Sequence, residues 1–344
     1  MMKVAVSGVG GGVGQSIMKA LTIGSLPVEV YPVDITPFSA GLYRGVQGTV
    51  LPPPETPEGL VTWASWLQAK GIDALIPGSD HDALPLASVR DEWATKGICR
   101  ILVSCLDLVQ TCRDKAMTYQ RLQALGLPVP KSVWDLSLSD ALSWARSQGF
   151  PLVVKPRDGF ASRGVHVVRD EEEFSFFFRR TAKPLVQEYL SLSGEVEEFT
   201  CAVFVDCEGV PVGTFIARRD LSAGTTYRAE IGFWQEIHDL LVRIGAALRP
   251  RGPLNVQLRL TERGPVPFEL NIRCSGTAAI RAHFGYNEPE MLLRHFVLGE
   301  QLVAPKPRRG FVFRYWNEIF LEDVSRERLI ADPGSLHGSV RAWP

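Results

Sequence analysis

The residues best suited to chemistry lie in the second half of the chain and have the character of a phosphate and metal site. Glu269, Asn271 and Arg273 alternate by two in "PFELNIR", so on a strand they project from one face. Carboxylate and amide oxygens are the hard ligands that magnesium prefers, and Gln257, in "NVQLRL" on the expected partner strand, adds another. Arg273 is then placed to hold a transferring phosphoryl group.

Two lysines supply cationic donors for phosphate oxygens. Lys115 lies at the start of the helical pattern "DKAMTYQRLQALG", and Lys155 ends the apolar run "PLVVK". The loop that follows, residues 158–164, contains Ser162 and Gly164. Because glycine permits close approach, this loop can bring backbone N–H groups to a phosphate.

Strand and helix patterns alternate over the first hundred residues. Short apolar strands are expected at 3–8, 28–34, 73–78 and 99–104, and helices at 15–23 and 57–71. This alternation predicts a parallel, doubly wound sheet. The pattern then changes to two hairpins, 198–206 with 210–219 and 254–260 with 266–273, separated by a helix over 237–248. The segment 220–232 is interpreted as a loop excursion near the active site.

The glycine-rich stretch "SGVGGGVGQ", residues 7–15, leaves two interpretations open. Its spacing misses the strict dinucleotide fingerprint, although Asp34 ends the second strand where an acidic residue can meet a ribose. The glycines can equally serve a close strand-to-helix turn. A helix that begins near Gly11 and Gly12 could also hold a substrate carboxylate or phosphate.

Composition describes an ordinary globular protein. The 344 residues are 45% hydrophobic with a net charge of −1, and no basic block or long apolar span is present, so we expect no nucleic-acid or membrane partner. The six cysteines form no Cys-x-x-Cys pair, which favours reduced thiols in a cytoplasmic protein.

The order of these pieces resembles the ATP-grasp superfamily, most closely the carboxylate–amine ligases related to the large chain of carbamoyl-phosphate synthetase and to biotin carboxylase. The resemblance spans about 103–299. It implies a Rossmann-like domain (1–108), then an ATP-grasp α+β fold in two parts, 109–186 with a mobile lid and 187–304 with the metal site, and an extension over 305–344. The loop 158–164 is poorer in glycine than is usual in the family.

The resemblance also implies roles for individual residues. ATP would contact Lys115, Lys155 and the loop with its phosphates, Glu188, Tyr189 and Leu190 with its adenine, and Glu198 with its ribose. Magnesium, or Mn²⁺ in its place, would be held by Gln257, Glu269 and Asn271. Arg273, with Arg218 or Arg219, would stabilise the phosphoryl group. A homodimer is the family's usual arrangement.

The candidate substrate residues come from loops near this site. In chain order they are Gly11, Gly12, Asp80, Asp82, Thr225, Thr226, Arg228, Ser275, Gly276, Thr277 and Arg281. Each also has a purely local interpretation, as a loop residue or a helix cap.

The predicted function is an ATP- and magnesium-dependent ligase that joins a small carboxylate to a small amine through an acyl phosphate. Two other classes stay open. One is an NAD(P)-dependent oxidoreductase that uses the N-terminal glycine loop, and the other is a non-catalytic, nucleotide-sensing module with the same fold.

Overall fold

The computed structural model describes residues 1–159, 163–315, 317–322, 324–332 and 340–342. The N-terminal part is a five-stranded sheet of order β3-β2-β1-β4-β5 in which every neighbouring pair is parallel. Its strands are β1 (Met2–Val6), β2 (Val28–Asp34), β3 (Thr49–Val50), β4 (Ala74–Ile76) and β5 (Arg100–Ile101). The predicted parallel sheet is therefore confirmed.

Helices cover both faces of this sheet. They are α1 (Gly12–Ile23), α2 (Pro57–Lys70) and α3 (Asp80–Thr95), and a 3₁₀ turn, Ala40–Arg44, follows β2. Val4 and Val6 pack with α1, whereas Ala5, between them, faces the other way towards α2 and α3, as strand alternation requires. The ends of α2 follow from local sequence, because the Thr56 side chain accepts from the Gly59 N–H and Gly71 closes the helix at φ 62°.

The second large sheet is antiparallel, with six strands in the order β14-β13-β10-β11-β12-β15. Its strands are β10 (Glu198–Val205), β11 (Pro211–Ser222), β12 (Thr225–Ile231), β13 (Gly252–Thr261), β14 (Gly264–Asn271) and β15 (Gly310–Phe313). Both predicted hairpins are confirmed, and the register sets Gln257 opposite Glu269. Helix α8 (Gln235–Leu248) packs its apolar face on this sheet.

The expectation of a loop over 220–232 is wrong. This segment completes β11 and forms β12, so it is a third hairpin of the sheet. Its two turn residues, Ala223 and Gly224, both have positive φ, 48° and 73°. Two left-handed residues match the twist of a tight hairpin, and they allow the chain to reverse without a longer excursion.

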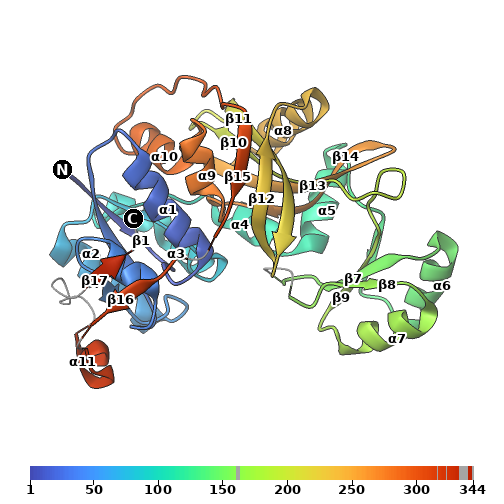
Figure 1. Ribbon diagram of the computed structural model, residues 1–344, viewed down its shortest axis with the longest axis horizontal. Coiled ribbons are helices and arrows are strands. Elements are labelled where there is room, and N and C mark those ends of the chain that lie inside the picture. Colours follow the sequence, from blue (N-terminus) through green and yellow to red (C-terminus); the bar gives the residue numbers. More distant parts are fainter. Residues whose placement is uncertain (160–162, 316, 323, 333–339, 343–344) are drawn as a thin grey trace.

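A third sheet forms a small lobe that lies apart from the rest in Figure 1. It has the order β6-β9-β7-β8, from β6 (Ser132–Trp134), β7 (Leu152–Pro156), β8 (His166–Val168) and β9 (Pro184–Glu188), and it carries α6 (Leu138–Gln148) and α7 (Glu171–Arg180). The lobe has its own apolar cluster, which includes Val154 and Phe174. Helices α4 (Leu106–Arg113) and α5 (Lys115–Ala124) connect it to the N-terminal sheet.

The two large sheets share their core. Each of the two main apolar clusters contains residues from both: Leu75 and Val256 belong to one, Val6 and Phe204 to the other. Helices α9 (Ala278–His283) and α10 (Glu288–Phe296) follow the second sheet and pack against α1. The parallel sheet and the antiparallel sheet are thereby held in one body.

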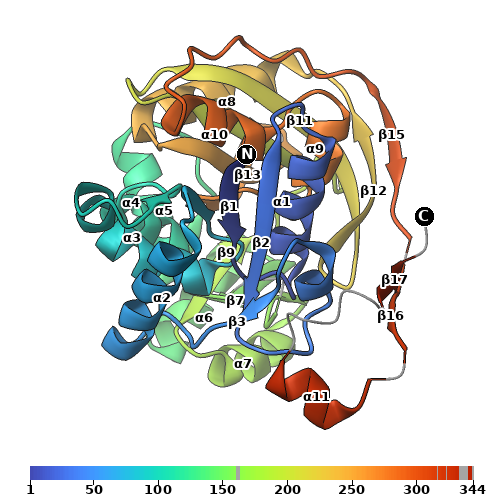
Figure 2. The same ribbon diagram turned by 90° about the vertical axis from the view of Figure 1, so that its left-hand side faces the viewer.

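After β15 the chain runs down one side of the molecule through β16 (Ile319–Leu321) and α11 (Arg326–Ala331) to β17 (Val340–Ala342) (Figure 2). The Arg326 guanidinium lies over the Phe38 ring, 4.7 Å from its centre, which ties this segment to the N-terminal part. All six cysteines are free thiols. Of the helices within the described ranges, none has the length and apolar character needed to cross a bilayer.

Candidate functional site

The strand pair β13–β14 assembles the predicted metal set. Glu269 Oε1 accepts hydrogen bonds from Gln257 Nε2 at 3.3 Å and from Asn271 Nδ2 at 3.1 Å. The two amide oxygens point away from the Glu269 carboxylate. Gln257 Oε1 accepts a hydrogen bond from Arg219 at 2.7 Å, and Asn271 Oδ1 accepts one from Arg273 at 3.4 Å. The sequence predicted that Glu269 and Asn271 share a face and that Gln257 lies on the partner strand, and a β-bulge in the pairing of the two strands brings Gln257 opposite Glu269.

These side chains fit a magnesium ion by donor chemistry. No cluster of three or more His, Cys, Asp or Glu side chains that could hold a metal occurs among the described residues. A divalent ion would therefore depend on one carboxylate and two amide oxygens, which are hard donors. Both amides now direct their NH₂ groups at Glu269, so metal binding would require each to turn over and present its oxygen.

Lys155 lies beside this set in a buried position, with 3% of its surface exposed. Its Nζ donates to Gln187 Oε1 at 2.7 Å and to the Tyr119 hydroxyl at 3.0 Å. The Tyr119 hydroxyl also bonds to the Phe268 carbonyl, one residue before Glu269. Burial, reinforced by the charge of Lys115, lowers the pKa of Lys155 to about 7.

Lys115 begins α5 and is also buried; its Nζ donates to the Gly159 carbonyl at 2.6 Å. It lines a cavity of about 140 Å³ together with Glu269 and Asn271 on one side and Asp80 on the other. Gly164, at φ 70°, occupies a backbone conformation that favours glycine. Ser162, predicted to contact the nucleotide, lies outside the described residues.

The predicted adenine segment follows β9. Glu188 accepts from the Lys131 N–H at 2.7 Å and pairs with Arg263, so its carboxylate is held by local contacts. The next two residues border Arg259: its Cζ lies 5.6 Å from the centre of the Tyr189 ring, and its Nη1 is 3.4 Å from the Leu190 carbonyl oxygen. The segment is thus adjacent to β13.

Glu198, predicted to hold the ribose, lies between two arginines. It is 8% exposed and its Oε1 accepts from Arg219 Nε and Nη2 at 3.1 and 2.8 Å. Its Oε2 accepts from Arg259 Nε and Nη2 at 3.0 and 2.9 Å. These four bonds anchor both arginines, and the contact of Glu198 with the ribose stays a prediction.

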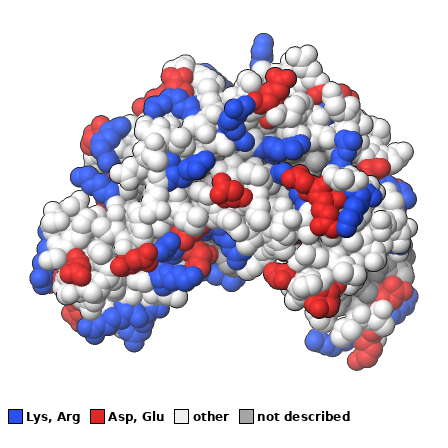
Figure 3. All heavy atoms as spheres, turned by 180° about the vertical axis from the view of Figure 1, so that it is seen from behind, with Lys and Arg blue, Asp and Glu red and all other residues white. Residues whose placement is uncertain are grey.

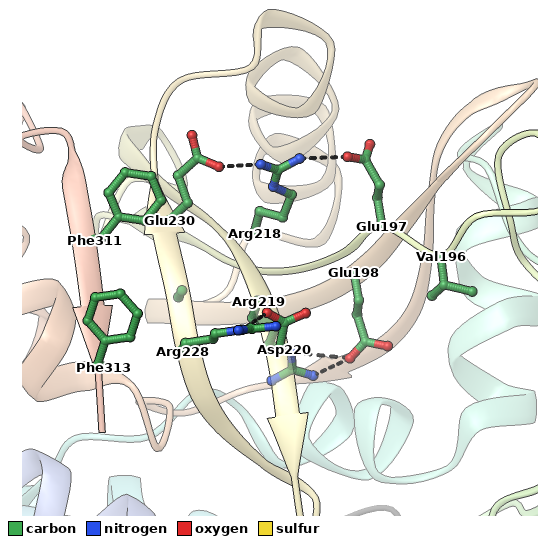
Figure 4. Close-up of a pocket in the computed structure, with 11 residues that line it drawn as sticks. Val196, Glu197, Glu198, Arg218, Arg219, Asp220, Arg228, Glu230, Phe311 and Phe313 are labelled. Atoms are coloured by element: carbon green, nitrogen blue, oxygen red, sulfur yellow. Dashed lines mark hydrogen bonds and ion pairs between the residues drawn. The ribbon is translucent and has the colours of Figure 1, made fainter. Parts of the chain in front are cut away.

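The structure separates the two arginines that the sequence left as alternatives (Figure 4). Arg219 turns to Glu198 and Gln257. Arg218 projects from the other side of the strand, where it pairs with Glu197 at 2.8 Å and Glu230 at 2.5 Å. Both border an open pocket of about 420 Å³. Of the two, Arg219 contacts the predicted metal set, through Gln257, so the structure favours Arg219 of the two alternatives.

Arg273 makes a two-pronged ion pair with Asp80. The distances are 2.8 Å from Nε to Oδ1 and 2.6 Å from Nη2 to Oδ2. Burial alone would raise the pKa of Asp80, but the charge and hydrogen bonds of Arg273 hold it below its ordinary value. Asp80, which the sequence placed at a substrate amine, thus holds an arginine in this structure, and its contact with a substrate stays a prediction.

Asp82 and Asp34 organise the glycine loop from two sides. Asp82 is buried and accepts from the Ser7 hydroxyl at 2.8 Å, while Asp34 accepts from the Gly10 N–H at 2.7 Å. These contacts support a local role for both carboxylates, while the substrate role expected of Asp82 stays a prediction. A Cβ atom at Gly14 would lie 2.5 Å from the Gly8 carbonyl oxygen, which confirms the close strand-to-helix turn.

Three further substrate candidates are engaged by other parts of the chain or lie at a turn, and their contact with a substrate stays a prediction. Arg281 is fully buried and pairs with Glu288 at 2.8 Å, so it belongs to the core. Arg228 is exposed and pairs with Asp220. Thr225 is the exposed first residue of β12, opposite Ser222 at the hairpin turn.

The remaining substrate candidates gather where α1 begins. Gly11 is the residue before α1, and Gly12 lies against Gly276, whose added Cβ would be 3.9 Å from the Gly12 carbonyl carbon. The buried hydroxyls of Ser275 and Thr277 bond to each other at 3.0 Å. Thr226 is buried, with its hydroxyl 3.4 Å from Arg219 Nη1.

Sequence reasoning missed three residues of this site: Arg259, Tyr119 and Gln187. Their partners lie between about 30 and 150 positions away in the chain, in contacts such as Lys155 with Gln187 and Tyr119 with Phe268. A signal for Arg259 was available, because it follows Gln257 by two residues and so shares its face of β13.

Comparison with known proteins identifies the architecture. A family model described as an ATP-grasp domain matches residues 112–206, and one described as ATP-grasp in the biosynthetic pathway with Ter operon matches 181–319. The chain belongs to the ATP-grasp superfamily.

Two solved structures share the ATP-grasp fold of this chain. Biotin carboxylase from Campylobacter jejuni has a TM-score of 0.72 at 14% identity over 90% of this chain and 74% of that one. N5-carboxyaminoimidazole synthetase from Staphylococcus aureus, complexed with ADP, has a TM-score of 0.71 at 13% identity over 89% and 80%.

Curated relatives match parts of this ATP-grasp chain. The carbamoyl phosphate synthase large chain of Pyrococcus furiosus is 26% identical over 264 residues, 66% of this chain and 24% of that protein. The glutamate–LysW ligase ArgX of Sulfurisphaera tokodaii is 38% identical over 68 residues, 20% of this chain and 24% of its own. The chain spans about a quarter of the length of these relatives.

Proposed function

We propose that this protein is an ATP- and magnesium-dependent ligase that joins a carboxylate to an amine on small metabolites. The supporting observation is the hydrogen-bonded series Arg219–Gln257–Glu269–Asn271–Arg273, of which Glu269 and Asn271 line one cavity together with Lys115. This series combines metal donors with phosphate donors. The activity named for one relative, the glutamate–LysW ligase ArgX, agrees with the proposal.

The charge of the site favours a polyanionic ligand. Five cationic residues meet three carboxylates here, a formal excess of two positive charges when Lys155 is protonated. The cations are Lys115, Lys155, Arg219, Arg259 and Arg273, and the carboxylates are Asp80, Glu198 and Glu269. A nucleoside triphosphate with one divalent ion would balance this excess.

The chemistry follows from these residues. A carboxylate loses oxygen poorly, so transfer of a phosphoryl group to it provides an acyl phosphate with a good leaving group. Lys115, Lys155 and Arg273 would hold and neutralise phosphate oxygens, and the bound ion would add charge neutralisation between them. The amine then attacks the acyl carbon and phosphate leaves. The protein supplies position and charge, with no nucleophile of its own.

The decisive experiment is an ADP-release assay with pairs of acids and amines, followed by mass analysis of the product. We expect magnesium-dependent ADP release that requires both substrates. Glu269→Ala should abolish this release without unfolding the protein, whereas Glu262→Ala, an exposed glutamate at the turn of the same hairpin, should leave it unchanged. Normal ADP release by the Glu269 variant would show that the metal site is placed wrongly.

A further inference from the structure

Strand β15 is the end strand of the antiparallel sheet and presents an aromatic stripe to solvent. It pairs with β12 on one side, and within the described residues no strand follows it on the other. Phe311, Phe313 and Tyr315 are 67%, 71% and 79% exposed, and the two phenylalanine rings lie on the same side of β15 in Figure 4. Val312 and Arg314, which alternate with them, are half-buried. Strand alternation thus gives β15 an inner face and an aromatic outer face.

The direction of the backbone groups on this edge follows from the pairing with β12. The Arg314 N–H donates to the Tyr227 carbonyl at 2.8 Å, so the even-numbered residues of β15 bond to β12. In an antiparallel ladder the residues between them turn their N–H and C=O groups to the opposite side. Phe311 and Phe313 therefore direct their backbone groups away from the sheet. Such an edge, with an apolar face beside it, is a template for another strand.

We propose that β15 pairs antiparallel with β15 of a second copy of this chain, about a twofold axis at Val312. The antiparallel sheet then continues from one subunit into the other, through an interface remote from the proposed ATP and metal chemistry. The sequence led us to expect a homodimer but gave no position for its contact.

The residues along β15 complement themselves when the strand is reversed, which favours a second copy over another partner. Pairing about Val312 sets Phe311 opposite Phe313 of the partner subunit, and the reverse, with their outward backbone groups in register to bond. The same register sets Tyr315 opposite Arg309 of the partner subunit. Arg309 is exposed, so each end of the stripe gains a cation–π pair. Aromatic pairs directly across two strands stabilise a sheet.

The size of the stripe fits a reversible dimer. Phe and Tyr side chains each contribute about 150–250 Å² of surface when buried, and two thirds or more of each of these three residues is exposed. The stripe therefore offers roughly 400 Å² of aromatic surface per copy, about half of what one partner buries in a standard interface. With the backbone bonds and flanking residues, we expect a dissociation constant in the micromolar range.

The first test is sedimentation equilibrium of the full chain from low to high micromolar concentration. We expect a monomer–dimer equilibrium in the wild type. Phe311→Lys and Phe313→Lys place a charge on the exposed edge, as many natural edge strands do, and each should weaken the association at least about tenfold. Phe176→Lys is the matched control, because Phe176 is a phenylalanine of the small lobe that is 48% exposed, and it should dimerise like the wild type.

A second test keeps the aromatic stripe intact. The two Val312 residues face each other across the axis as a non-hydrogen-bonded pair, with Cα atoms about 4.5 Å apart, which a disulfide can bridge. Mild oxidation of Val312→Cys should link two subunits covalently, beyond the background that the native thiols give in the wild type. Val61→Cys, at a 66% exposed position of α2, is the control and should give that background alone.

Three results would each overturn the proposal. One is a wild-type protein that sediments as a monomer at high micromolar concentration. Another is a dimer that both lysine variants, shown to be folded by circular dichroism, leave intact. The third is a Val312→Cys protein that cross-links no more than the wild type. None of these readouts depends on ATP or magnesium, so the dimer and the proposed function can fail separately.

Discussion

At the residue scale, Lys155 shows how burial sets the charge of a group in this site. An exposed lysine would be protonated throughout the physiological range. Enclosed by Tyr119 and Gln187 and close to Lys115, its ammonium loses hydration and meets a like charge, so its pKa falls to about 7. Nucleotide phosphates would favour the protonated form and draw the pKa back up.

Nucleotide affinity should consequently depend on pH. Below pH 7 Lys155 is already charged in the free protein. As pH rises from 7 to 9, binding must first protonate it, so the affinity for MgATP should fall by up to about tenfold per pH unit. Calorimetric titration at pH 6, 7, 8 and 9 measures this slope. Lys155→Arg, which stays charged, should flatten it, and equal slopes in the two proteins would contradict the role of Lys155.

At the element scale, the turn from β1 into α1 depends on closely packed backbone. Ser7, Gly8 and Gly14 approach one another because Gly14 carries no side chain: an added Cβ would lie 2.5 Å from the Gly8 carbonyl oxygen and 2.8 Å from that of Ser7. Gly12, at the start of the same helix, has nothing within 4 Å of the corresponding position. The structure therefore leaves room for a side chain at Gly12 but not at Gly14.

Gly14→Ala should lower the free energy of unfolding by about 2 kcal/mol, because the clash is with backbone that cannot rotate away. Gly12→Ala should cost nothing, or stabilise slightly through helix propensity. Urea denaturation of the two variants beside the wild type gives both values. Equal stability of the two variants would contradict the close packing of this turn.

At the scale of the whole molecule, Asp80 and Arg273 join the two large sheets. Asp80 begins α3 of the parallel sheet and Arg273 follows β14 of the antiparallel one, 193 positions further along the chain. The space-filling view from behind shows the outline hollowed between the small lobe and the rest of the molecule, with charges of both signs on its border (Figure 3). The Asp80–Arg273 ion pair is thus one of the contacts through which the parallel and the antiparallel sheet meet.

Asp80→Asn should destabilise the protein by about 2 kcal/mol at neutral pH, since a largely buried arginine loses its counter-charge. Because Arg273 holds the pKa of Asp80 below its ordinary value of 3.8, this contribution is complete above that value and is lost as pH falls through the lower, folded pKa. The difference between wild type and variant should be constant from pH 5 to 8 and shrink near pH 3. Denaturation curves at pH 3, 5 and 7 test this, and a difference that persists at pH 3 would contradict it.

The sequence by itself determined what depends on neighbours along the chain. Alternation placed Glu269 and Asn271 on one face, the turn at Arg263–Gly264 put Gln257 on the partner strand, and helix periodicity identified the buried face of α8. The pairing of Gln257 with Glu269 itself depends on a β-bulge between Leu258 and Gln257, which only the structure showed. These features follow from backbone geometry and local turns, whose periods can be read from a few residues.

Only the tertiary structure decided which charges meet. Asp80 and Arg281 looked equally free to bind a substrate, yet one pairs with Arg273 and the other is buried against Glu288. Glu198 anchors two arginines because Arg219 and Arg259 reach it from two different strands. Ion pairs form between groups brought within a few ångströms by packing of distant segments, and no spacing along the chain encodes that distance.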